Sequence, residues 1–82
     1  MTKDDIKKRL EKKFCNDTIE VRDMTSNSNH FGVLVISNQF DSLSLIKRHQ
    51  LIYSLFQDEL TYEIHALQIN TYTKSEWKGK NI

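Results

Sequence analysis

The chain has 82 residues, which is enough for one domain with a single small core. Its charged fraction of 28% and apolar fraction of 38% are typical of a folded globular domain and exclude a disordered tail. The net charge of +1 excludes a generally basic protein, so nucleic acid would have to bind through a local patch. No apolar run approaches the roughly 18 residues of a transmembrane helix, and the charged N-terminus lacks a secretory pattern. We therefore expect a cytoplasmic protein without membrane partners.

The chain has a single cysteine, Cys15, which limits its redox and metal chemistry. An internal disulfide is impossible, and one thiol cannot form an all-protein thiolate site for zinc or an iron–sulfur cluster. Any metal therefore needs imidazoles or groups from a partner. No His or other Cys is near Cys15 in the sequence, so we interpret it as a partly buried small hydrophobe rather than a nucleophile.

A helix is predicted over residues 2–14. Thr2 can cap its N-terminus, and Asp5 follows three residues later in a box-like pairing. Acidic residues interrupt the lysines and the arginine of this segment, which favours a solvated face over a nucleic-acid or membrane footprint. Its apolar residues recur every four positions and form one stripe: Ile6, Leu10 and Phe14.

Two strands are predicted next. Apolar and charged residues alternate over residues 19–22, as in a half-buried strand. Residues 31–36 are apolar and β-branched, so we expect them to pair back on the first strand as a hairpin. Polar residues 24–29 form the connecting loop, and residues 38–42 form a turn after the second strand.

A helix, a strand and a short helix are predicted in the second half of the chain. Ser44 can cap a helix that ends near residue 57, and alternation returns over residues 64–72. Residues 73–76 form a capping box that opens a last helix with Trp77 near its start. Residues 78–82 are expected to be a frayed tail. One face of the helix after Ser44 carries Leu45, His49, Ile52, Tyr53 and Phe56.

The chain is thus expected to be a single α+β domain over residues 1–82, with the order αββαβα. A helix connects the second and third strands, so these strands should be parallel and the three-stranded sheet mixed. Both long helices would pack on one face of the sheet. The expected core consists of Ile6, Leu10, Phe14, Val33, Val35, Leu45, Ile52, Phe56, Leu67 and Ile69.

Several segments resemble the BolA family. They are the run Phe31-Gly32-Val33-Leu34-Val35-Ile36-Ser37, Phe40-Asp41, the helix around Arg48-His49, Asp58-Glu59-Leu60, Ile64-His65-Ala66-Leu67, Thr71-Tyr72-Thr73 and Glu76-Trp77. The resemblance covers residues 6–77 and implies a fold like class II KH domains. It further implies a non-enzymatic protein, consistent with the absence from the sequence of a Gly-rich phosphate loop and of a His-Glu-x-x-His motif.

The resemblance implies a [2Fe–2S] cluster shared with a monothiol glutaredoxin that carries Cys-Gly-Phe-Ser, with glutathione supplying a thiolate. The histidine of the Ile-His-Ala-Leu motif is His65, and a second ligand would come from the loop between the first two strands. Residues 25–29 lack the usual Cys or His, which leaves His30, as in a short-loop bacterial subgroup with Ser-His-Phe. An imidazole nitrogen donates to iron without adding negative charge. Because the ring must be neutral to bind, imidazole ligation predicts a pH-sensitive cluster. The isolated chain is expected to hold no cofactor.

The sequence departs from the family pattern at two further positions. Ser42 stands where a Gly is usual, and Gln50 stands where a second Arg usually follows Arg48-His49. We interpret His49 as a structural residue with one ring nitrogen hydrogen-bonded, and we interpret Trp77 as structural too.

A DNA-binding transcriptional regulator of stress response and cell morphology is the alternative function, because family members are also described in that role. The candidate contacts with a partner or nucleic acid are Arg48, Lys47, Lys74 and Lys78. Arg48 reads either as a surface contact or as a solvated charge, and its motif favours the contact. A second copy of the chain is a further candidate partner.

Overall fold

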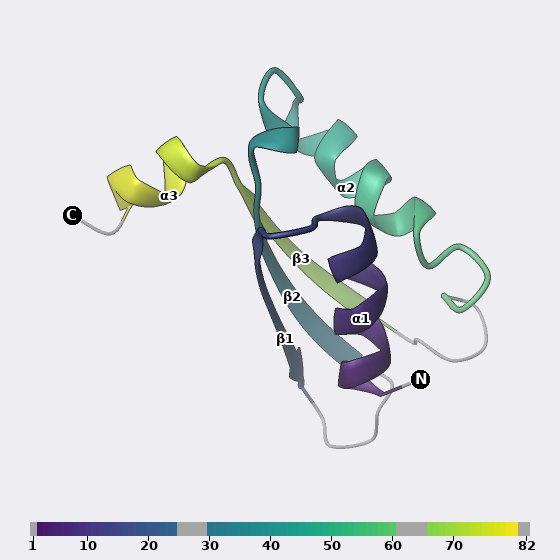
Figure 1. Ribbon diagram of the computed structural model, residues 1–82. Coiled ribbons are helices and arrows are strands. Elements are labelled where there is room, and N and C mark those ends of the chain that lie inside the picture. The colour runs from purple at the N-terminus through teal and green to yellow at the C-terminus, as the bar shows by residue number, and fades with distance from the viewer. Residues whose placement is uncertain (1, 25–29, 61–65, 81–82) are drawn as a thin grey trace.

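The computed structural model describes residues 2–24, 30–60 and 66–80. Helices α1 and α2 cover one face of a three-stranded sheet, and α3 projects from the end of the last strand (Figure 1). The predicted order αββαβα is confirmed, with a short 3-10 helix added before α2. The elements are α1 (Lys3–Lys13), β1 (Thr18–Asp23), β2 (His30–Ile36), η1 (Asn38–Phe40), α2 (Leu45–Ser54), β3 (Ala66–Tyr72) and α3 (Lys74–Lys80).

The sheet is mixed, with the strand order β1-β2-β3. β1 pairs with β2 in antiparallel fashion, and Thr18 lies opposite Ile36. β2 pairs with β3 in parallel fashion, and His30 lies opposite Ala66. The prediction that the second and third strands are parallel is therefore confirmed. Side chains alternate between the face under the helices and an open face.

Local hydrogen bonds cap the helices at the predicted residues. The Thr2 hydroxyl accepts from the Asp5 N–H at 3.2 Å, and the Thr2 N–H donates to the Asp5 carboxylate at 2.9 Å. These bonds from Thr2 lower the pKa of Asp5. Ser44 caps α2 by accepting from the Lys47 N–H at 3.2 Å. Each cap satisfies backbone donors that the first helical turn leaves without partners.

The core lies between the two long helices and the covered face of the sheet. Nine of the ten predicted core residues are buried, and Phe31 and Phe40 join them. The Phe14 and Phe40 rings are 5.3 Å apart, which links the end of α1 to η1. The prediction that Leu45 belongs to the core is wrong, since this residue is 63% exposed. Arg48 lies over the Phe40 ring at that end of α2 instead.

Among the described residues, two predicted element ends differ from the structure by more than one residue. α2 ends at Ser54, earlier than predicted, and turns follow it. α3 continues through Lys80, so the predicted frayed tail is wrong for residues 78–80, while residues 81–82 lie outside the described part. The Lys80 ammonium lies 5.4 Å from the centroid of the Tyr72 ring, a contact that holds this last turn. Among the described helices, none has the length and apolar character needed to cross a bilayer.

Candidate functional site

The first candidate ligand, His30, is the first residue of β2 and is half-buried. Its carbonyl accepts from the Met24 N–H at 2.8 Å, and the parallel register sets it beside Ala66. The second candidate, His65, lies outside the described residues and precedes Ala66 in the sequence. Among the described residues there is no group of three or more His, Cys, Asp or Glu side chains arranged to hold a metal ion. The edge formed by His30 and Ala66 is called the histidine end below.

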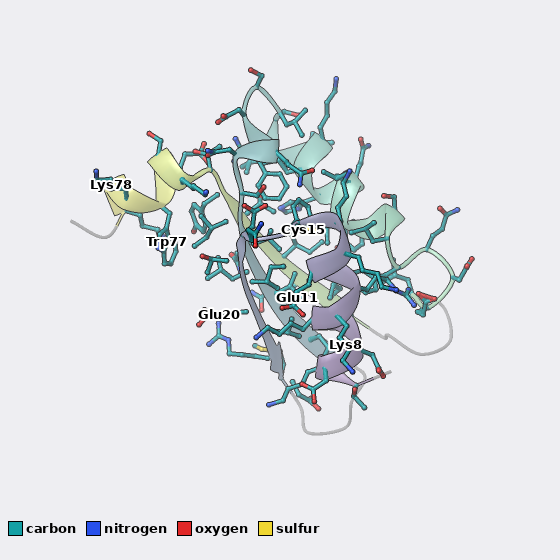
Figure 2. The ribbon with its side chains drawn as sticks, in the orientation of Figure 1. Lys8, Glu11, Cys15, Glu20, Trp77 and Lys78 are labelled. Carbon is teal, nitrogen blue, oxygen red and sulfur yellow. The ribbon has the colours of Figure 1, made fainter. Side chains whose placement is uncertain are left out.

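The single thiol lies at the opposite end of the sheet. Cys15 follows α1 and is exposed, so the prediction of a partly buried residue is wrong (Figure 2). The next strand begins at Thr18, which pairs with Ile36 at the far end of β2. With a rise of about 3.3 Å per residue, β2 separates Ile36 from His30 by about 20 Å. The sulfur of Cys15 and the histidine end are therefore far apart.

Arg48 is buried and structural, so its predicted role as an exposed contact is wrong. Its side chain is only 9% exposed. Nε donates to the Leu43 carbonyl at 2.9 Å, and Nη1 and Nη2 donate to the two carboxylate oxygens of Glu76 at 2.7 and 3.2 Å. The guanidinium also lies 5.8 Å from the centroid of the Phe40 ring. This two-pronged geometry ties α2 to α3 and leaves the charge little access to an external partner.

The interaction with Arg48 lowers the pKa of Glu76. Its hydrogen bond from Arg48, followed by the one from the Thr73 N–H, holds the pKa of the carboxyl at about 2, below its ordinary value. The Thr73 N–H donates to Glu76 at 2.7 Å, and the Thr73 hydroxyl accepts from the Glu76 N–H at 3.1 Å. Glu76 thus completes the predicted capping box of α3 while also binding Arg48.

The other predicted cationic contacts are exposed and lie at the end of the sheet opposite His30. Lys47 is in the first turn of α2, and Lys74 and Lys78 are in α3, which follows the last residue of β3. The Lys74 N–H donates to the Asn38 side chain at 3.3 Å, which sets the start of α3 against η1. Lys78 lies on α3 well away from the long helices (Figure 2). Lys47, Lys74 and Lys78 are called the basic end below.

The two residues predicted as structural have different surroundings. Trp77 is half-buried, and its ring centroid lies 5.2 Å from that of Tyr72. His49 is half-buried on α2, between the exposed Leu45 and Tyr53 four residues to either side. The packing of Trp77 on Tyr72 agrees with its predicted role, whereas the hydrogen-bonded ring nitrogen of His49 stays a prediction.

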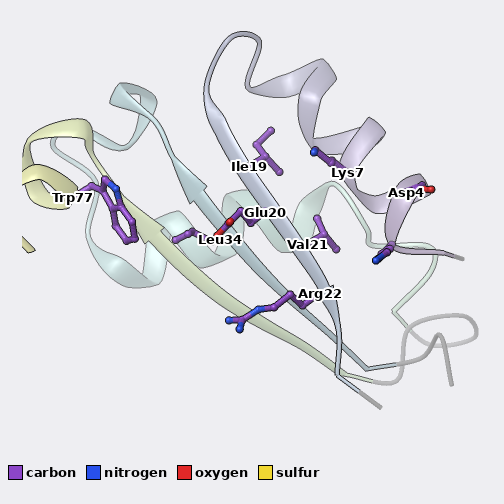
Figure 3. Close-up of a pocket in the computed structure, with 9 residues that line it drawn as sticks. Asp4, Lys7, Ile19, Glu20, Val21, Arg22, Leu34 and Trp77 are labelled. Atoms are coloured by element: carbon purple, nitrogen blue, oxygen red, sulfur yellow. The ribbon is translucent and has the colours of Figure 1, made fainter. Parts of the chain in front are cut away.

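Sequence reasoning missed a cleft of about 560 Å³ along β1. Its walls come from the first turns of α1, from β1 itself, and from Leu34 and Trp77 (Figure 3). Glu20 and Arg22 point to the side of Trp77, whereas the apolar residues of β1 point toward α1. The alternation of charged and apolar residues over 19–22 was the available signal. It predicted the strand but not that the strand would lie at an edge.

This fold defines a class of small α+β domain in which a mixed three-stranded sheet is covered by two helices, with a third helix at one end. The sequence profile described as "BolA-like protein" matches residues 10–76. The chain therefore belongs to the BolA family.

Relatives and solved structures of the family cover most of this chain. The Vibrio cholerae protein named "DNA-binding transcriptional regulator BolA" is 36% identical over 99% of this chain and 83% of its own length. A Haemophilus influenzae protein of the same name is 38% identical over 67% of this chain, and the match spans 53% of that protein. The BolA domain of SufE1 from Arabidopsis thaliana superposes with a TM-score of 0.83 and 38% identity, covering 90% of this chain and 93% of that one.

Proposed function

We propose that this chain is a non-enzymatic adaptor that contributes histidine ligands to a [2Fe–2S] cluster shared with a monothiol glutaredoxin and glutathione. One observation carries the proposal. The parallel register of β2 and β3 sets His30 beside Ala66, the residue that follows His65 in the chain. His65, which is distant from His30 in the sequence, is therefore bonded to the residue that lies beside His30.

The donor set fits a shared cluster and does not fit one held by this chain alone. Imidazole nitrogens replace two thiolates on one iron in Rieske-type centres, so a pair of histidines can supply the protein ligands of one iron in the cluster. The remaining ligands of a [2Fe–2S] cluster are thiolates, and the thiol of Cys15 lies at the opposite end of the sheet. A partner must therefore supply sulfur, as the active-site cysteine of a monothiol glutaredoxin and glutathione would. When bound, such a cluster supplies a transferable iron–sulfur unit whose retention depends on neutral imidazole.

Reconstitution with a monothiol glutaredoxin, glutathione, ferrous iron and sulfide tests the proposal. The wild-type chain should give a coloured heterodimer, and both His65→Ala and His30→Ala should change its visible circular dichroism. His49→Ala is the matched control, because it removes the third histidine of the chain, which lies on α2. Identical spectra for the wild type, His30→Ala and His65→Ala would remove both imidazoles from the site.

DNA binding is the second candidate function, and a specific observation favours it. The bacterial relatives quoted above carry the name of DNA-binding regulators. The basic end offers Lys47, Lys74 and Lys78 as exposed phosphate contacts. Each phosphate contact releases counterions, so binding to duplex DNA should weaken steeply with salt. Replacing Lys74 and Lys78 by Glu should abolish that binding, and the absence of saturable binding by the wild type would reject the role for this chain.

The two candidate functions use opposite ends of the sheet, so substitutions can separate them. His65→Ala should alter the cluster and leave DNA binding unchanged. The Lys74→Glu and Lys78→Glu double variant should do the reverse. A double variant that loses both activities while keeping its far-ultraviolet circular dichroism would show that the two surfaces overlap.

A further inference from the structure

β1 is an edge strand whose outward backbone groups can be assigned. The sheet order leaves one side of β1 without a neighbouring strand among the described residues. The Met24 N–H donates to the His30 carbonyl across the β1–β2 ladder. Hydrogen-bonded pairs alternate along an antiparallel ladder, so Glu20 and Arg22 also turn their backbone groups toward β2. Ile19 and Val21 therefore turn theirs outward, into the cleft.

We infer that two copies of this chain associate along β1, in antiparallel fashion, about a two-fold axis at Val21. The two three-stranded sheets then join into one six-stranded sheet with both open faces on the same side. Val21 would lie opposite its own copy as a hydrogen-bonded pair, using the outward N–H and carbonyl groups. A two-fold interface of this kind is isologous, so the same surface must complement itself.

Charge complementarity selects this register. With Val21 on the axis, Glu20 lies opposite Arg22 of the copy and Arg22 opposite Glu20 of the copy. Both positions are non-hydrogen-bonded pairs, where cross-strand side chains are closest. A shift of the pairing by two residues in one direction opposes Glu20 with Glu20, and the reverse shift opposes Arg22 with Arg22. Like charges therefore disfavour both of the neighbouring antiparallel registers in which the outward backbone groups of β1 can still form hydrogen bonds.

The charged pair is available for such an interface. Glu20 and Arg22 are exposed on the open face, and neither forms an ion pair with another described residue. Figure 3 shows both side chains on the side of β1 that faces Trp77, with the cleft continuing around the strand to α1. On that other side, Val21 is half-buried and would cover its copy with an apolar contact. The interface thus combines backbone hydrogen bonds, an apolar centre and two ion pairs.

Sedimentation velocity from micromolar to millimolar concentration tests the inference with charge-swap variants. The wild type should show a concentration-dependent dimer. Glu20→Arg alone, or Arg22→Glu alone, turns both cross-strand pairs into like-charge pairs. The dimer dissociation constant of each single variant should therefore rise by about 30-fold. The double variant restores two opposite pairs and should dimerise again.

Mixing the two single variants provides the sharpest readout. One variant carries two arginines at these positions and the other two glutamates, so a mixed dimer contains two attractive pairs and should form where neither variant dimerises alone. Far-ultraviolet circular dichroism checks that each variant is folded. A wild type that stays monomeric at millimolar concentration would overturn the inference. So would a dimer that all the charge swaps leave unchanged, because another surface or another occupant would then account for the association.

Discussion

Substitution of Arg48 by Met tests whether this residue acts through packing within the chain. The change keeps an unbranched side chain of similar length and removes the guanidinium. It deletes the bond to the Leu43 carbonyl, both bonds to Glu76 and the contact with the Phe40 ring. A surface contact for a partner would tolerate this change without loss of stability, whereas a buried tie between α2 and α3 would not.

The magnitude follows from the burial of the guanidinium. Water screens the two bonds to Glu76, because that side chain is 46% exposed. The magnitude therefore comes from the buried bond to the Leu43 carbonyl and from the contact with the Phe40 ring. A hydrogen bond from a charged group contributes about 1.5–3 kcal/mol, and a cation over an aromatic ring contributes about 0.5–1 kcal/mol. We expect Arg48→Met to lower the free energy of unfolding by about 2–4 kcal/mol. Arg48→Lys keeps the charge but loses the fork, and it should fall between Met and the wild type.

Equilibrium unfolding in urea, followed by circular dichroism, measures these differences. Lys47→Met is the matched control, because Lys47 is the neighbouring residue in α2, was also predicted as a contact, and is exposed. It should change the free energy of unfolding by less than about 0.5 kcal/mol. Equal losses for Arg48→Met and Lys47→Met would refute the argument that burial of the guanidinium sets the cost.

Three further predictions concern single side chains. The pKa of Glu76 is about 2 in the folded chain, below its ordinary value of 4.5. The stabilising contribution of its carboxylate is therefore complete above about pH 4.5 and is lost as the pH falls toward 2. Glu76→Gln should remove this part of the acid sensitivity in a pH series of thermal melts. The buried Thr71 hydroxyl has no hydrogen-bond partner among the described residues, so Thr71→Val should raise stability by about 1 kcal/mol, whereas Thr73→Val, which removes a cap, should lower it by about 1 kcal/mol. If both valine variants shift the melting temperature in the same direction, the assignment of the unpaired hydroxyl is incorrect. A Cβ on Gly32 would lie 3.1 Å from the Met24 sulfur. Gly32→Ala should therefore raise the free energy of unfolding by about 0.4–1 kcal/mol in a Met24→Ala background and by less in the wild type. Equal effects in both backgrounds would contradict that contact.

Features set within a few residues of one another were predictable from the sequence. The caps by Thr2 and Ser44, and the box formed by Thr73 and Glu76, depend on side chains that reach backbone groups within three residues. Strand and helix patterns were equally readable, because burial of one face imposes a period of two or of about 3.6 residues on the sequence. The parallel relation of β2 and β3 also followed, since a helix connects them.

The tertiary structure decided the features that depend on residues far apart in the chain. The sequence alone marks Arg48 as a charge on a helix, and only the docking of α3, 28 residues later, buries it against Glu76. Likewise, alternation in β1 does not say whether a strand is central or at an edge, so the cleft and the outward groups of Val21 emerged only from the sheet order. The placement of His30 beside Ala66 is of the same kind. Local patterns define each element because their hydrogen bonds close within a turn, whereas burial and proximity depend on how the elements pack.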